Sequence, residues 1–208
     1  VATLLALAPA ALSDIFALGL PVWAGWPGAV LALVTVFTTS MIYAQLRTVP
    51  RWNHPVTPLL YLAYAVFGGV LLAGQVRAAA VAGLILFMAI AASWRIGDRR
   101  FAEVAQTIGT ATGLGNLGSV RVFERGHTAG NYLLSEMIHI VGRRHAARLR
   151  IIALAFSTLI PAGLLVLAGP HPAVIALAVA CHLLGALAQR WLFFAEAEHV
   201  VGLYYGMR

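Results

Sequence analysis

The sequence contains no lysine and little charge of any kind. Charged residues make up 10% of the 208 residues, and all 14 basic residues are arginine, whereas hydrophobic residues make up 61%. A soluble domain carries about a quarter charged residues, so a chain of this size could not cover its surface with the polar groups present. These proportions exclude a soluble globular protein and predict an integral membrane protein.

Cysteine is nearly absent as well. The single cysteine, Cys181, lies in an apolar run, so the chain can form no intrachain disulfide and cannot supply the thiolates of an iron–sulfur cluster. A b-type haem needs two axial histidines at matching depth, and only His182 falls well inside an apolar segment. We therefore expect no haem and no metal site, with the ring of His182 bonded to a carbonyl of a neighbouring helix.

Six stretches meet the requirement of about 20 mostly apolar residues for a membrane-spanning helix. Strands are not expected, because the stretches lack the alternation of a barrel and an open sheet edge cannot be satisfied in lipid. The predicted fold is an all-α polytopic transmembrane helix bundle that forms a single membrane domain over residues 1–208. The predicted spans are residues 1–20, 25–46, 55–75, 78–96, 151–169 and 172–192.

The arginines predict the topology. With six spans, every arginine except Arg77 falls on one side: in the connector after the second span, at the end of the fourth span and in the loop 97–150 that follows it, or in the C-terminal region. The positive-inside rule places that side in the cytoplasm, so the first span is expected to begin there and the C-terminus to lie there, in a bacterial inner membrane. Arginines beside a membrane are explained by anionic lipid headgroups, and we expect no nucleic-acid partner.

The loop 97–150 contains Gly113, Gly115 and Gly118 in a G-x-G-x-x-G spacing. A dinucleotide fingerprint needs a strand before the first glycine and a helix after the third. In this chain an amphipathic helix is predicted before the glycines and a β-prone segment follows them, so the order is wrong. We expect the glycines to serve turns in an interfacial loop.

Polar residues near the ends of the spans allow two interpretations. The segment that leaves the last span combines ionisable residues with aromatic ones, and the connector after the second span has a tryptophan and a histidine at the membrane edge. Such residues can anchor a helix at the headgroup level, or they can line a quinone-binding site or a proton path. The candidates for the second role are Arg190, Glu196, His199, His54 and Trp52.

Three stretches carry a resemblance to a known family. Residues 42–62, "IYAQLRTVPRWNHPVTPLLYL", and 185–206, "GALAQRWLFFAEAEHVVGLYYG", resemble the membrane anchors of the dimethyl sulfoxide reductase family. Residues 110–150 look like the variant found in anchors of cytoplasmic sulfite-oxidising, quinone-reducing enzymes. The resemblance implies an eight-span, haem-free subunit, of which this sequence holds six spans. The chain begins without Met, and an acidic residue that the family uses near its quinol site would fall just before Val1.

What the resemblance implies is a non-catalytic subunit of an oxidoreductase complex. It would anchor a molybdopterin catalytic subunit and an iron–sulfur electron-transfer subunit at the cytoplasmic face. It would pass electrons from sulfite oxidation to ubiquinone or menaquinone. The alternatives are the anchor of a reductase that takes electrons from quinol, a purely structural anchor, and an unrelated transporter. The candidate contacts to the partner subunits are Arg51, Arg95, Arg99, Arg100, Arg121, Arg125, His127 and Asn131.

Overall fold

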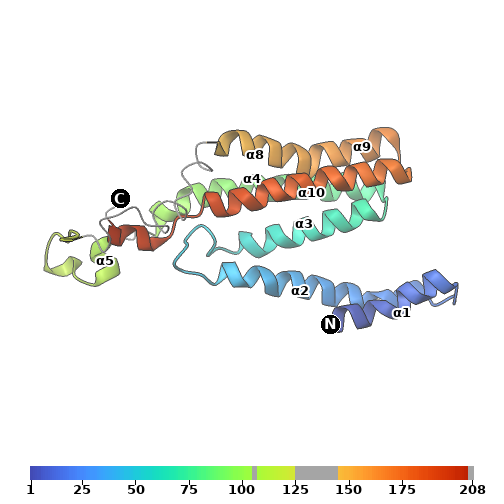
Figure 1. Cartoon of the computed structure of the whole chain (residues 1–208), viewed down its shortest axis with the longest axis horizontal. Helices are drawn as coiled ribbons and strands as arrows, with labels where there is room; N and C mark the ends of the chain where they lie inside the picture. Colours follow the sequence, from blue (N-terminus) through green and yellow to red (C-terminus); the bar gives the residue numbers. More distant parts are fainter. Residues whose placement is uncertain (105–106, 125–144, 206–208) are drawn as a thin grey trace.

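The computed structural model describes residues 1–104, 107–124 and 145–205, and helices are the regular elements within them. Long helices lie side by side in an elongated bundle (Figure 1). The N-terminal pair consists of α1 (Ala2–Phe16) and α2 (Trp26–Ala44), joined through the short helix η1 (Val22–Gly25). The next helices are α3 (Val56–Leu72) and α4 (Val76–Glu103). One continuous stretch then consists of α8 (Ala146–Leu154), the π-helical turn η3 (Ala155–Leu159) and α9 (Ile160–Ala168), and α10 (Pro172–Ala195) follows it.

Membrane-spanning length is reached by four helical stretches of the described chain. They cover Val22–Ala44, Val76–Arg100, Ala146–Ala168 and Pro172–Ala195. The other two apolar helices, α1 and α3, have 15 and 17 residues and are shorter than the roughly 20 residues that a span requires. An all-helical membrane fold is therefore confirmed, and four of the six predicted spans have the length and composition to cross a membrane.

The first helix differs from the prediction in its length and position. Residues 1–20 were expected to form a span that begins at the basic side, but α1 ends at Phe16 because Ala17 takes a left-handed conformation with φ 51°. The Thr3 and Thr35 hydroxyl oxygens lie 3.1 Å apart, and Thr35 sits halfway along α2. The helix thus pairs with the first half of α2, and its start is level with the middle of that helix.

The core lies where α3, α4, α9 and α10 meet. Phe67 and Leu71 of α3, Leu86 and Ile90 of α4 and Leu165 of α9 are fully buried. Each long helix also turns leucines, isoleucines and valines outward, as expected for a surface in contact with lipid. In an α-helix the backbone hydrogen bonds form within the segment, which is how a chain can cross a bilayer without unsatisfied polar groups.

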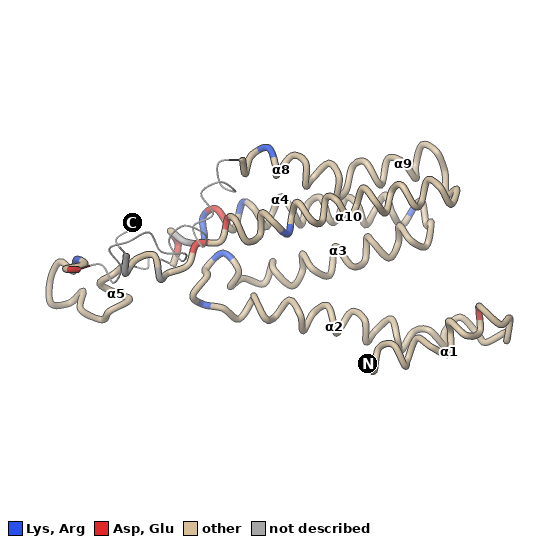
Figure 2. Tube along the Cα trace, in the orientation of Figure 1, with Lys and Arg blue, Asp and Glu red and all other residues tan. Residues whose placement is uncertain are grey.

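Charged residues gather at one end of the bundle, where α2 and α10 end and α3 and α8 begin; we call this the basic end (Figure 2). Arg77, the second residue of α4, lies at the opposite end. The helix α4 has 28 residues, and at about 1.5 Å per residue it extends well past the start of α3. It leads into the small helix α5 (Ile108–Thr112) and the turn η2 (Gly115–Leu117), beyond the basic end.

The glycine-rich segment forms turns. Gly113 ends α5 in a left-handed conformation with φ 72°, and Gly118 has φ 147°. A Cβ at Gly115 would lie 3.2 Å from the backbone of Gly109, so the two glycines let the chain fold back on itself. No strand follows in the described residues up to 124. The prediction of turns is confirmed, and the segment has no dinucleotide-binding geometry.

Candidate functional site

Arg190 lies in a cage of aromatic side chains near the end of α10. Its guanidinium donates hydrogen bonds to the hydroxyl oxygens of Tyr61, on α3, and Tyr43, on α2. The guanidinium carbon also lies 4.4 Å from the ring centroid of Phe194 and 4.9 Å from that of Phe193. Cation–π contacts and neutral hydroxyl acceptors stabilise a charge in an apolar setting. Within the described residues, no carboxylate forms an ion pair with Arg190.

Trp52 holds the end of α10 against the connector between α2 and α3. Its ring stacks on Phe193, with centroids 5.0 Å apart and an interplanar angle of 5°. Its Nε1–H donates to the Phe193 carbonyl oxygen at 2.9 Å, one of the last carbonyls of the helix, which have no partner inside the helix. The Trp52 indole N–H is therefore committed to the protein backbone.

Four charged side chains form a closed network beside this aromatic group. Arg51 donates to Asp98 at 2.9 Å and to Glu196 at 2.5 Å. Arg150 donates to Glu196 at 2.7 Å and, through two nitrogens, to Asp98 at 2.6 and 2.8 Å. The network carries no net charge, and it joins the α2–α3 connector, α4, α8 and the end of α10. Each carboxylate is held by two guanidinium groups.

A glycine makes room for this network. A Cβ at Gly97 would lie 2.9 Å from three atoms of the Arg51 side chain, so Arg51 lies flat across α4 at this point. The Glu196 side chain is only 7% exposed, whereas the Asp98 side chain is 45% exposed. The network thus runs from the interior of the protein to its surface, with Glu196 at the inner end.

The two predicted histidines lie in different connecting segments. The His54 Nδ1 accepts the backbone N–H of Val56 at 3.1 Å, which caps the start of α3. His199 follows α10 in the short segment before η4 (Val200–Tyr205), where burial lowers its pKa below the usual value. The Val200 N–H donates to the Thr48 carbonyl at 2.9 Å, and this bond ties the C-terminal segment to the α2–α3 connector.

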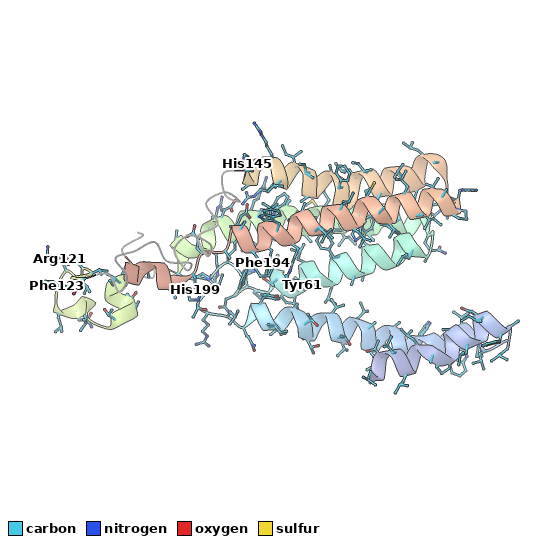
Figure 3. The ribbon with its side chains drawn as sticks, in the orientation of Figure 1. Tyr61, Arg121, Phe123, His145, Phe194 and His199 are labelled. Atoms are coloured by element: carbon cyan, nitrogen blue, oxygen red, sulfur yellow. The ribbon has the colours of Figure 1, made fainter. Side chains whose placement is uncertain are left out.

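A pocket of about 480 Å³ lies between α3 and α10. This volume is within the range of small-molecule sites, which combine apolar walls with a few polar groups. Figure 3 shows Tyr61, at the edge of this pocket, and Phe194 near the basic end of the bundle. The pocket is lined by Leu60, Tyr61, Tyr64, Leu183, Ala186, Leu187, Gln189, Arg190 and Phe193.

A second cavity, of about 20 Å³, shares Leu60, Gln189 and Phe193 with this pocket. Trp52 and Glu196 contribute to this cavity and not to the larger one. Of the five predicted quinone-site residues, Arg190 alone lines the larger pocket. The structure therefore separates residues that the sequence had grouped together, with Arg190 at the pocket, Trp52 and Glu196 behind it, and His54 and His199 in the connecting segments.

Tyr64, which lines the pocket, also takes part in a polar contact inside the bundle. The Tyr64 and Ser157 hydroxyls share a hydrogen bond of 2.9 Å. The His182 Nδ1–H donates to the Ser157 carbonyl oxygen at 2.8 Å. Pro161 explains why that carbonyl is available, because a proline has no N–H to give to the residue four positions earlier. The prediction that His182 would bond a carbonyl of a neighbouring helix is confirmed.

The backbone around Ser157 is a π-helical turn, in which the Ile160 N–H donates to the Ala155 carbonyl five residues earlier. Such turns interrupt α-helices and are frequent at functional sites. The helix α10 packs very closely on this turn, because a Cβ at Gly185 would lie 2.2 Å from the Ser157 nitrogen. The pocket residue Tyr64 is therefore bonded, through Ser157, to an irregular and tightly packed part of the bundle.

The predicted partner contacts fall into three groups. Arg51 is engaged in the ion network. Arg95 and Arg99 are exposed on α4, Arg100 pairs with Glu103 at 3.5 Å, and Figure 3 shows Arg121 on the exposed segment beyond the bundle. The other three predicted contacts, Arg125, His127 and Asn131, lie outside the described residues.

Several residues of the site were missed from the sequence. These residues are Tyr43, Tyr61, Tyr64 and Gln189. In the sequence nothing distinguishes them from other residues of apolar segments, because their contacts form only when the helices pack together. One signal was available for the polar contact inside the bundle, since Pro161 lies four residues after Ser157 in an apolar helix and leaves one carbonyl free. Within the described residues, no group of three or more His, Cys, Asp or Glu side chains could hold a metal ion.

The fold and the pocket define an all-helical membrane protein with an apolar pocket between two helices. The sequence is similar to one of the subunits of the sulfite dehydrogenase of Allochromatium vinosum, with 30% identity over 192 residues, 86% of this chain. The chain spans 58% of the length of that relative. The similarity supports a relationship to a subunit of a sulfite dehydrogenase. No protein-family model matches the chain, and no solved structure matches it.

Proposed function

We propose that this chain is the quinone-interacting membrane anchor of a molybdopterin and iron–sulfur oxidoreductase complex that passes electrons from sulfite to the quinone pool. The pocket between α3 and α10 is the observation that carries the proposal. It combines apolar walls with Tyr61, Tyr64, Gln189 and Arg190, which suits a ring that bears two carbonyl oxygens. The similarity to a sulfite dehydrogenase subunit supports sulfite as the source of the electrons.

The proposed topology follows from the arginines. The basic end is cytoplasmic, in a bacterial inner membrane, and the chain supplies six apolar helices of an eight-span subunit, of which α1 and α3 are shorter than the other four. The iron–sulfur and molybdopterin subunits dock at this end, against the exposed Arg95, Arg99 and Arg121 and against Arg100, with Arg125, His127 and Asn131 as further contacts. Arg190 is near the end of α10, and Glu196 of the ion network directly follows that helix, so in this topology the pocket is on the side from which the electrons arrive.

The overall reaction balances without a redox group in this chain. Sulfite and water give sulfate, two protons and two electrons on the partner subunits. A bound quinone takes up two electrons and two protons and leaves as quinol. The side chains of this chain bind and orient the ring, and Leu60, Leu183 and Leu187 exclude bulk water from it. Arg190 provides a fixed positive charge beside the pocket, which favours a reduced and more negative ligand.

Filling the pocket tests the proposal. In the intact complex, Leu183→Trp places an indole in the pocket and should abolish most sulfite-dependent reduction of decylubiquinone. Sulfite oxidation with ferricyanide, which can take electrons from the partner subunits, should stay normal. Leu184→Trp is the matched control, because Leu184 is the next residue of α10, is similarly exposed at 57% against 56%, and does not line the pocket.

Two results would contradict the proposal. If the assembled Leu183→Trp complex reduces quinone at the normal rate, another site or another subunit binds the quinone and this chain is a structural anchor. If the complex oxidises added quinol with an acceptor such as dimethyl sulfoxide and does not oxidise sulfite, the chain is the anchor of a reductase. Retention of the partner subunits on purification shows that each variant has assembled.

A further inference from the structure

Gln189 is the polar residue that the two cavities share. It lines both the pocket of about 480 Å³ and the cavity of about 20 Å³. The residue is only 6% exposed, and its side-chain oxygen Oε1 is enclosed without a hydrogen-bond partner. A buried amide oxygen without a hydrogen-bond donor destabilises the folded protein, so a donor such as a bound water is expected next to it. The position differs from that of the neighbouring Arg190, whose two terminal nitrogens each donate a hydrogen bond to a tyrosine, Tyr43 or Tyr61.

Trp94 supplies a second unsatisfied group at the small cavity. Its Nε1–H is enclosed and has no hydrogen-bond partner, and both Trp94 and Gln189 line the cavity. About 10 to 15 Å³ is enough space for one water molecule if polar partners are present. A water at this point can accept the Trp94 N–H and donate to the Gln189 Oε1. Two unsatisfied groups of opposite hydrogen-bonding character therefore share one cavity of the right size.

Fixing the Oε1 also fixes the rest of the amide. The amide group is planar, so a water bound to one end sets the direction of the Nε2 at the other end. The Nε2 is a donor with two hydrogens, and Gln189 lines the pocket of about 480 Å³. A quinone carbonyl is an acceptor. The donor and the ligand group are complementary.

We infer that Gln189 is a specificity-determining residue of the pocket, which donates a hydrogen bond to a ring carbonyl of the ligand and is oriented by a water bound to Trp94. This inference rests on the proposed function, because it assigns a role within the same pocket. Trp94 acts through the water and is a positioning residue. The ligand class is a 1,4-quinone, and a ligand of similar shape without carbonyl oxygens would not satisfy the amide.

The test uses the intact complex loaded with decylubiquinone labelled with ¹³C at one ring carbonyl. A hydrogen bond lowers the carbonyl stretching frequency, which infrared difference spectroscopy detects without turnover. Gln189→Met, which is unbranched and lacks a donor, should raise the bound carbonyl frequency and raise the KM for quinone about 3- to 10-fold, the loss expected for one hydrogen bond. Trp94→Phe should shift the frequency in the same direction by less.

Controls keep the inference separate from the proposed function. Gln75→Leu, at the opposite end of the bundle, should change neither the frequency nor the KM. If Gln189→Met does not assemble, Gln189→Leu serves as the second variant. If the wild-type complex binds quinone and both readouts are unchanged in the assembled Gln189 variant, the inference is overturned while the proposed function stands. If Gln189→Met has the expected effect and Trp94→Phe has none, the proposal that a water bound to Trp94 orients Gln189 is overturned.

The failure of the proposed function would look different. In that case Leu183→Trp would leave the bound-quinone infrared signal of the complex intact, which would place the quinone away from this pocket. The Gln189 variant would then also have no effect. The pair of variants therefore distinguishes a wrong assignment of Gln189 from a wrong assignment of the pocket.

Discussion

The His182 ring nitrogen Nδ1 lies 2.8 Å from the Ser157 carbonyl oxygen, the carbonyl that Pro161 leaves without a helical donor. This contact crosses from α10 to the π-helical turn η3, and Gly185 permits the close approach of the two helices. A proline in one helix is thus compensated by a histidine in another. The arrangement also fixes the position of Tyr64, whose hydroxyl bonds the same serine at the edge of the pocket.

His182→Leu should destabilise the protein by about 1–3 kcal/mol, because it leaves a buried carbonyl without a donor. Pro161→Ala should offset much of that loss in the double variant, since the new N–H can donate to Ser157 in a regular α-helical turn. Thermal unfolding of the purified complex in detergent, carried out as a double-mutant cycle, measures the coupling. Strictly additive effects of the two substitutions would contradict this account of the contact.

Gly185→Ala should disrupt the packing of α10, because the added Cβ would lie 2.2 Å from the Ser157 nitrogen. Overpacking of this kind costs about 1–3 kcal/mol or more. Gly163→Ala is the matched control, since Gly163 lies in α9 with open space around it and alanine favours a helix over glycine by about 0.5–1 kcal/mol. The expression level and the midpoint temperature of thermal unfolding should fall for Gly185→Ala only. If both variants have the same expression level and midpoint temperature, the close contact between the two helices is contradicted.

The two tyrosines that bond Arg190 should differ in their effects. Tyr61 lines the pocket and Tyr43 does not, although each accepts one hydrogen bond from the guanidinium. Tyr61→Phe and Tyr43→Phe should both lower stability by about 1 kcal/mol. Only Tyr61→Phe should also change the KM for quinone. Steady-state kinetics and thermal unfolding of the two variants separate these effects, and equal changes in KM would show that the pocket boundary is misplaced.

In the ion network, Glu196→Gln should be more damaging than Asp98→Asn. Each substitution removes one carboxylate from two guanidinium groups, but Glu196 is at the buried end and Asp98 is 45% exposed. Removing one partner of a well-buried ion pair costs about 3–5 kcal/mol of stability, which is the upper range for Glu196→Gln. Asp98 is in contact with water, so the cost of Asp98→Asn should be closer to that of surface pairs, about 0–1 kcal/mol.

Thermal unfolding at low and high salt measures this ranking. The Asp98→Asn effect should shrink in high salt, because screening weakens exposed pairs more than buried ones. Arg95→Gln, on the exposed face of α4, is the control and should change stability by less than about 0.5 kcal/mol. A larger effect for Asp98→Asn than for Glu196→Gln would contradict the order of burial.

The helices and the basic end were predictable because hydropathy and charge are properties of single segments. The stretches 172–192 and 78–96 lie within α10 and α4, and Arg190 was identified as a candidate from its position near a helix end. The prediction failed where the outcome depends on a local conformation, as at Ala17, which ends α1 early. The G-x-G-x-x-G spacing was correctly assigned to turns because the order of the flanking elements ruled out a nucleotide site.

The pocket was not predictable in the same way, because it depends on which faces of α3 and α10 meet. Tyr61, Tyr64 and Gln189 stand on those faces, and no spacing in the sequence distinguishes them from residues that face lipid. Trp52 and Glu196 were predicted as quinone-site or proton-path candidates from their position near the membrane edge. Their partners, the Phe193 carbonyl and two arginines, are distant in the sequence, so their local roles become clear only in the folded bundle.

The neutral ion network has a consequence for biogenesis. During membrane insertion, positive charges beside the spans orient a chain, and Arg51 and Arg150 then act as unpaired cations. In the folded protein both are neutralised by Asp98 and Glu196, so they no longer attract anionic headgroups. The positive charge that orients the chain during insertion is therefore larger than the net positive charge at the surface of the folded protein. After folding, Arg51 and Arg150 form ion pairs that link the helices of the bundle.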